Sequence, residues 1–398
     1  MLSYRFLFDI AIILLSTKVF GLISQKLKMP QVVGALFAGV ILGPAVLNIL
    51  HETEFIHQMA ELGVIVLMFT AGLEADVNEL KKTGKAATVI AILGVLVPLL
   101  GGFLVSYIFS EGRGAVDTNA LLQDIFVGVI LTATSVSITV QTLKELGSLN
   151  SRAGNTILGA ALIDDILGII ILTIITSLAD TSVNIYLVFI KIVLFFVFAI
   201  LFAIVFKKVF KIWADKYNGD VRRFAITSFV ICLLLSFIAE EVFGVADITG
   251  AFIAGLIISN NKKSEYIDSR FETLSYMLLS PIFFASIGIR VEITGMNLDT
   301  IIFTVILLII AILTKIIGCA LGAKLCKYSI HESVQIGAGM VSRGEVALIV
   351  ANKGIAVSLI NTSFLTPIVI VVVITTVITP ILLEIAFSRE KKIDELLD

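Results

Sequence analysis

The chain has 398 residues, of which 58% are hydrophobic and only 15% are charged. An ordinary soluble domain has about 45–50% apolar and about 25% charged residues, so this composition excludes a water-soluble fold. The net charge of −2 leaves no basic excess to neutralise phosphates, which argues against a nucleic acid partner. Because the three cysteines and three histidines show no metal-ligand spacing, no cofactor is expected.

The sequence predicts about thirteen apolar segments that could cross a membrane. The first, residues 4–24, lacks a small-residue cleavage site before the polar residues 25–28, so we interpret it as a retained span. The others lie at residues 30–50, 57–76, 84–109, 120–143, 153–179, 183–206, 221–242, 246–259, 271–289, 300–323, 333–352 and 363–387. The expected fold class is therefore an all-α polytopic membrane protein surrounded by lipid.

The distribution of lysine and arginine predicts the orientation of the chain. Odd-numbered loops and the C-terminus hold 21 of these residues, whereas even-numbered loops and the N-terminus hold 4. Since basic residues in short loops stay in the cytoplasm, we expect a multi-pass protein of the cell (inner) membrane with its N-terminus outside and its C-terminus cytoplasmic. Only about a dozen residues follow the last span, so we expect no C-terminal soluble domain and no nucleotide cofactor.

The longest charged loop, residues 207–223, divides six spans from six and contains the single tryptophan, Trp213. The seventh span joins the two sets, so the second set begins on the opposite face of the membrane from the first. That topology predicts inverted repeats, which are typical of secondary transporters.

Two adjacent carboxylates, Asp164 and Asp165, lie near the middle of the sixth span. A charge at this depth costs at least about 2.5–3.5 kcal/mol and points to a function. Neighbouring helical side chains diverge by about 100°, so one carboxylate can meet a fixed cation while the other faces a water-filled cavity. Lys315 in the eleventh span is the available cation and can lose its proton. A purely structural ion pair would explain one aspartate and leave the other without a role.

Two spans carry signs of interrupted helices. The fifth contains a hydroxyl cluster that includes Thr132, Thr134 and Ser135, and such side chains can satisfy backbone groups where a helix unwinds. The twelfth contains three glycines with Arg343 and Glu345. Interrupted spans in corresponding places of two halves indicate an ion site. The alternatives are ordinary small-residue packing for the cluster and, equally open, a local ion pair between Arg343 and Glu345.

In these residues the chain resembles the cation:proton antiporter 2 family, and it is most similar to bacterial sodium/proton antiporters with a paired-aspartate motif. The resemblance covers essentially the whole chain. The matching motifs are residues 30–34, 39–44, 68–74, 132–135, 163–165, 247–255, 283–288 and 339–345, together with Lys315.

The resemblance implies a homodimer with crossed discontinuous helices in a mobile core bundle. Residues 1–76 and 221–290 would form the dimerisation bundle. Residues 84–180 and 300–388 would form the ion-translocating core, and residues 183–212 would form a linking helix. Transport would be an elevator-like movement of the core.

The resemblance also implies roles for individual side chains. Asp165 would carry the cation and the proton, with sodium bound at Asp165 together with Asp164, and Asp164 would be the partner of Lys315. Related potassium-efflux proteins usually have a Gln-Asp pair and a nucleotide-binding domain. The Asp-Asp pair of this chain favours sodium without excluding potassium.

The leading hypothesis is therefore an electrogenic sodium or lithium/proton antiporter, not an enzyme, that serves pH homeostasis. The alternatives are a potassium/proton antiporter of the same family, a gated cation channel, and a membrane subunit that holds a regulatory protein at residues 207–223. A channel would dissipate a cation gradient without moving protons, whereas an antiporter would couple the two.

Overall fold

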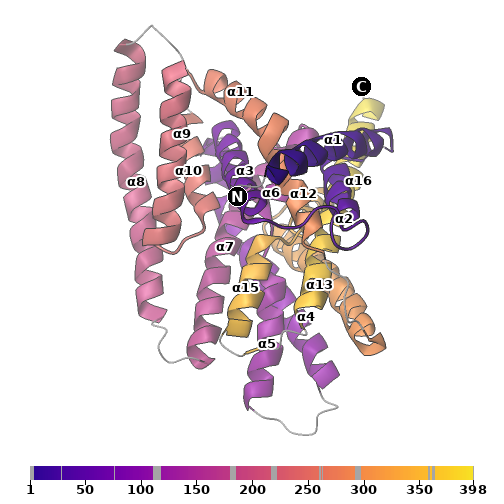
Figure 1. Ribbon diagram of the computed structural model, residues 1–398. Coiled ribbons are helices and arrows are strands. Elements are labelled where there is room, and N and C mark those ends of the chain that lie inside the picture. The colour runs from indigo at the N-terminus through magenta and orange to yellow at the C-terminus, as the bar shows by residue number, and fades with distance from the viewer. Residues whose placement is uncertain are drawn as a thin grey trace.

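The computed structural model describes residues 4–27, 29–75, 77–110, 118–179, 185–216, 222–259, 261, 263–291, 297–356, 359–360 and 364–397. Regular structure in these ranges is entirely helical (Figure 1). The first half contains α1 (Arg5–Lys26), α2 (Gln31–Leu42), α3 (Glu54–Glu74), α4 (Val77–Ser110), α5 (Thr118–Thr132), α6 (Val136–Glu145), α7 (Arg152–Ala179) and α8 (Ile185–Lys216). The second half contains α9 (Arg222–Phe237), η2 (Ile238–Val242), α10 (Asp247–Ser259), α11 (Ser264–Leu274), η3 (Ser275–Leu279), α12 (Ser280–Ile289), α13 (Leu298–Leu325), α14 (Ile330–Gly339), α15 (Glu345–Ala356) and α16 (Leu365–Leu397).

Each expected apolar segment coincides with a helix or with helices in succession. Among the described residues, ten helical stretches are long and apolar enough to cross a membrane, which makes the protein multi-pass. The segments around α2, α10 and α14–α15 are shorter. The number of thirteen crossings therefore stays a prediction.

The second segment differs from its expected extent of residues 30–50, because α2 ends at Leu42. Gly43 follows in an extended conformation with ψ of −175°. The reason lies in the next residue, Pro44, whose ring disfavours helical geometry in the residue before it.

The expected segment 246–259 is a separate helix, α10. The preceding helix α9 widens into the π-helical turn η2, and the chain then reverses at Gly244, which has a φ of +64°. Glycine is suited to this conformation because it has no Cβ.

The helices pack in two groups. In one, α1 packs on α2, α2 on α12, and α3 on α10 and α12. In the other, α4 packs along α5, α7 and α13, while α13 also contacts α14 and α16. Helix α8 lies at one edge and contacts α7 and α10 (Figure 1). The division into a dimerisation bundle, an ion-translocating core and a linking helix stays a prediction.

Helices α3 and α10 approach each other through two reciprocal glycines. A Cβ at Gly72 would lie 2.2 Å from the carbonyl oxygen of Phe252, and a Cβ at Gly255 would lie 2.2 Å from that of Phe69. The two backbones therefore touch, which is a common way for helices to associate in lipid.

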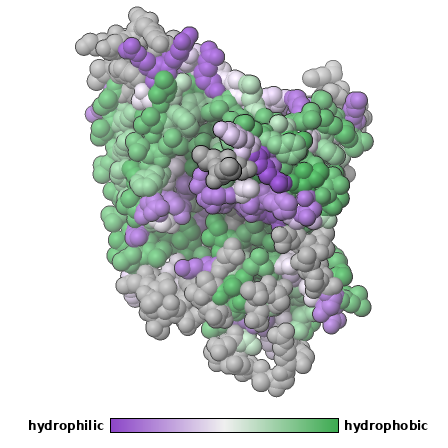
Figure 2. Space-filling view, in the orientation of Figure 1, coloured by the Kyte–Doolittle hydropathy of each residue, from purple (hydrophilic) through white to green (hydrophobic). Residues whose placement is uncertain are grey.

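The surface agrees with a lipid environment. Hydrophobic residues cover much of the face in Figure 2, and hydrophilic residues gather toward its middle. On α8, Leu187 and Ile200 are 50% and 60% exposed, as expected for side chains that face lipid and not a protein interior.

Candidate functional site

The two interrupted helices cross at their breaks. Residues 133–135 separate α5 from α6, and residues 340–344 separate α14 from α15. The N–H of Ser135 donates to the carbonyl of Ser342 at 2.8 Å, and the hydroxyl of Ser342 donates to the carbonyl of Ser135 at 2.7 Å. The predicted crossing of discontinuous helices is thus confirmed.

Hydroxyl groups satisfy part of the unwound backbone. The Oγ1 of Thr139 donates to the carbonyl of Gly339 at 2.6 Å and lies 3.1 Å from the Oγ of Ser342. Thr132 turns back to the carbonyl of Val129 at 2.7 Å within its own helix, and Thr134 is buried in the break. The cluster therefore makes polar contacts across the crossing in addition to packing.

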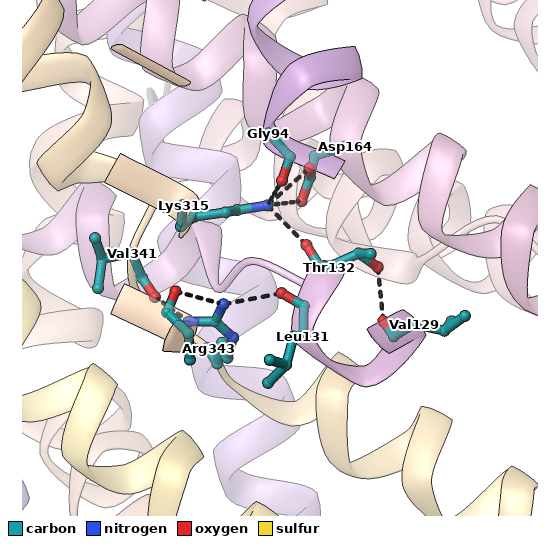
Figure 3. Close-up of polar contacts among 9 residues, drawn as sticks. Gly94, Val129, Leu131, Thr132, Asp164, Lys315, Val341 and Arg343 are labelled. Carbon is teal, nitrogen blue, oxygen red and sulfur yellow. Dashed lines mark hydrogen bonds and ion pairs between the residues drawn. The ribbon is translucent and has the colours of Figure 1, made fainter. Parts of the chain in front are cut away.

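Lys315 reaches this crossing from α13. Its ammonium donates to the Oδ1 and Oδ2 of Asp164 at 3.0 and 3.3 Å, to the carbonyl of Gly94 at 2.8 Å, and to the carbonyl of Thr132 at 2.7 Å (Figure 3). Lys315 is 0% exposed and Asp164 is 2% exposed. The structure thus brings together the predicted pair of Asp164 and Lys315. Sequence reasoning missed Gly94, because a search for reactive side chains does not consider a main-chain carbonyl.

Asp165 follows directly on α7 and has a different environment. Its Oδ2 atom is buried and has no hydrogen-bond partner in the part of the chain that the structure describes. Asp165 is 5% exposed. The expectation that one of the two carboxylates faces a water-filled cavity stays a prediction. The next residue of α7, Ile166, packs in an apolar cluster with Ile192 of α8 and Val245.

Asp247, at the start of α10, is close enough for its charge to act on Asp165. Its Oδ1 accepts the N–H of Ile248 at 2.7 Å. Sequence reasoning placed Asp247 at the opening of an apolar segment but did not assign it to the site. The sequence feature that could have indicated its role is a carboxylate at the start of a short apolar segment.

Arg343 lies in the second break and is 1% exposed. Its guanidinium donates to the carbonyls of Val341 at 3.0 Å, Leu131 at 2.9 Å and Ala311 at 2.9 Å (Figure 3). Because Leu131 is in the last turn of α5, Arg343 caps a carbonyl that the end of this helix leaves free. The side chain of Glu345 lies outside those that the structure describes, so the alternative of an ion pair between them is untested.

A cavity of about 580 Å³ lies between the two groups of helices. At its wall, Lys144 of α6 donates to Glu74 and Thr70 of α3, both at 2.8 Å. On the neighbouring residue, the Oε2 of Glu145 accepts the N–H of Gln31 at 2.6 Å. These contacts join the half-helix α6 to the other group of helices.

The chemistry available at the crossing is proton and cation binding. Among the described residues, no group of three or more histidine, cysteine or acidic side chains could hold a resident metal. The site offers one carboxylate bonded to an ammonium and a second with a free buried oxygen. A carboxylate oxygen can accept a proton or coordinate a hard cation, but not both at one position.

Comparison with known proteins gives a match over most of the chain. The family model described as "Sodium/hydrogen exchanger, transmembrane" matches residues 11–388. The chain is 39% identical over 392 residues to the "Na(+)/H(+)-K(+) antiporter GerN" of Bacillus cereus, covering 98% of each chain. It is 37% identical over 384 residues to a "Na(+)/H(+) antiporter" of Enterococcus hirae, covering 96% of this chain and 97% of that one. Among solved structures it is similar to the sodium proton antiporter MjNhaP1 of Methanocaldococcus jannaschii, with a TM-score of 0.69, 19% identity and 95% of each chain covered.

Proposed function

Because the chain belongs to the sodium/hydrogen exchanger family, a family of transporters and not of enzymes, we propose that it exchanges sodium or lithium for protons across the cell membrane and moves net charge in each cycle. The relatives described above include sodium/proton antiporters from two bacteria. The exchange would serve pH homeostasis.

The observation that carries this proposal is the pair of neighbouring aspartates in unlike environments. Asp164 is bonded to Lys315 at 3.0 Å, whereas the Oδ2 of Asp165 is buried and free among the described residues. A proton and a sodium ion would compete for Asp165, so one carboxylate could serve both directions of transport. Sodium bound at Asp165 would also contact Asp164, provided that Lys315 releases its hydrogen bond to Asp164.

The same arrangement supports electrogenic exchange. If sodium displaces the ammonium from Asp164, Lys315 can release one proton while Asp165 releases another. Two protons would then move against one sodium ion, and the cycle would carry one net charge.

For the conformational step we propose an elevator-like movement of α4–α7 and α13–α16 against α1–α3 and α9–α12. The cavity between the two groups supports such a movement, because residues of α6 line one side of it and residues of α1, α2 and α3 line the other. A homodimer that forms through α1–α3 and α9–α12 would give each mobile bundle a fixed support. The N-terminus would lie outside and the C-terminus in the cytoplasm.

The test is purified protein in proteoliposomes, with sodium, lithium and potassium gradients applied separately and internal pH recorded. We expect sodium-driven proton movement in the unmodified protein and none in Asp165→Asn, which keeps the side-chain size and removes the charge. Asp164→Asn is the matched control on the adjacent residue, and some exchange should remain in it. Sodium-driven proton release by folded Asp165→Asn would overturn the assignment of Asp165.

Potassium/proton exchange is the second candidate, because the name of the Bacillus cereus relative includes potassium. Proton movement driven by potassium alone would favour it. Cation flux without any proton movement would instead favour a channel.

A further inference from the structure

Helix α4 contains an internal proline, Pro98. Proline has no backbone N–H, so it cannot donate to the carbonyl four residues earlier in a helix. In α4 that carbonyl belongs to Gly94. A buried carbonyl without a donor is costly, especially in lipid, and needs a partner from elsewhere.

Lys315 is that partner, since its ammonium donates to the carbonyl of Gly94 at 2.8 Å. Its second main-chain acceptor, Thr132 at 2.7 Å, is the last residue of α5. Both carbonyls therefore lie where a helix leaves an oxygen free, one at a helix end and the other before a proline.

From this coincidence we infer that Pro98 is a positioning residue of the cation site: by withholding an N–H, it reserves the Gly94 carbonyl for the side chain of Lys315. The inference rests on the proposed antiport, which requires Lys315 to change its protonation state.

The number of hydrogen-bond donors explains why two such carbonyls matter. An ammonium has three donors, and Lys315 directs them to Asp164, Gly94 and Thr132. A neutral amine has two donors and one lone pair. After losing a proton it can keep both carbonyl bonds and release Asp164 to an incoming cation, so the nitrogen need not move between the two states.

The groups around Lys315 are few. Helices α4 and α5 present carbonyls to it, as described above, while α7 contributes the charges of Asp164 and Asp165. Cys319 lies one turn along α13, and Arg343 in the second break acts on Asp164. Of the contacts of Lys315, the one to Gly94 depends on Pro98.

The test is Pro98→Ala, which restores the missing N–H without adding bulk. The new donor competes for the Gly94 carbonyl, and a lost acceptor weakens the ammonium more than the neutral amine. In proteoliposomes, we expect the pH of half-maximal sodium-driven proton release to fall by roughly one unit. Thermal stability should be unchanged or higher, because alanine favours a helix.

Two controls separate this effect from a change in helix shape. Pro380→Ala removes the other internal helix proline, in α16, and should leave the pH profile unchanged. Lactic acid at position 98, introduced by nonsense suppression, lacks the N–H as proline does and should restore the wild-type profile. Pro98→Ser restores the same donor and serves where the alanine variant cannot be purified.

The outcomes are distinct. A wild-type pH profile in folded Pro98→Ala, or an equal shift with lactic acid at position 98 or in Pro380→Ala, overturns the inference alone. Absence of coupled exchange in the unmodified protein overturns the proposed function and the inference with it.

Discussion

The two interrupted helices differ in what they contribute to the crossing. The first break supplies acceptors, since the carbonyls of Leu131 and Thr132 end α5 and receive side chains from elsewhere. The second half supplies donors, namely Arg343 from its own break and Lys315 from α13. The hydrogen bonds between the breaks run in both directions, whereas both charged donors come from the second half. In lipid, where water cannot cap a helix end, each half completes the other.

Removing Arg343 should have the largest effect on stability. Arg343→Gln takes the guanidinium away from the carbonyls of Val341 and Leu131, which lie outside or at the end of a helix, and each orphaned group costs about 1–3 kcal/mol. We expect a loss of at least about 2 kcal/mol, measured as a large fall in melting temperature.

The matched variant is Lys315→Gln, in which Asp164 can accept a proton to remain neutral. This variant should fold and lose electrogenic exchange. If it retains voltage-sensitive exchange, Lys315 is only a structural partner.

We expect Gly344→Ala to push the two breaks apart and to destabilise the protein. A Cβ at this position would lie 2.7 Å from the Oγ and 2.9 Å from the Cβ of Ser135, and overpacking of this kind costs about 1–3 kcal/mol. Adding Ser135→Gly removes both contacted atoms and should recover most of the stability. No recovery in the double variant, measured by thermal unfolding, would show that the strain lies elsewhere.

The hydroxyl groups of Ser342 and Ser135, one in each break, should contribute unequally to the stability of the protein. Ser342 donates from its side chain across the crossing at 2.7 Å, so Ser342→Ala should cost about 1–2 kcal/mol. Ser135 uses its main chain for the crossing bond, and its hydroxyl contacts only Ser137 at 3.2 Å among the described partners. Ser135→Ala should therefore cost about half as much or less. The reverse order in melting experiments would contradict this assignment.

The smallest effect concerns how the two half-helices begin. Helix α14 starts with a capping box in which Glu332 accepts the N–H of Ser329 at 2.9 Å, whereas Ser135 before α6 makes no side-chain cap bond. Burial would raise the pKa of Glu332, but bonds from Ser329 and the charge of Arg152 outweigh it and lower the pKa below its ordinary value.

Because this pKa is lowered on folding, Glu332 stabilises the protein above its unfolded pKa of about 4.3, and the contribution is lost as the pH falls through the folded value. We expect Glu332→Gln to cost about 1 kcal/mol or less at pH 7 and almost nothing at pH 3. Melting curves across this range provide the measurement. A difference between the variant and the wild type that grows at low pH would contradict it.

The sequence predicted both breaks and a pairing of Lys315 with one of the two aspartates, because charges and clustered hydroxyls in an apolar segment are costly unless they have partners there. The choice of Asp164 as that partner came from the family resemblance. The extent of α2 was wrong, since hydropathy alone does not register the break before Pro44. The partners of Arg343 are main-chain carbonyls, and no side-chain pattern reveals them.

The touching backbones of α3 and α10 have a consequence for biosynthesis. Gly72 and Phe252 are about 180 residues apart in the sequence, and a ribosome adds about 5–20 residues per second. Helix α3 therefore stays in the bilayer for about 10–35 seconds before its partner exists. During that interval α10 does not yet cover the glycine face of α3. The insertion machinery or a neighbouring segment must cover this face until α10 emerges.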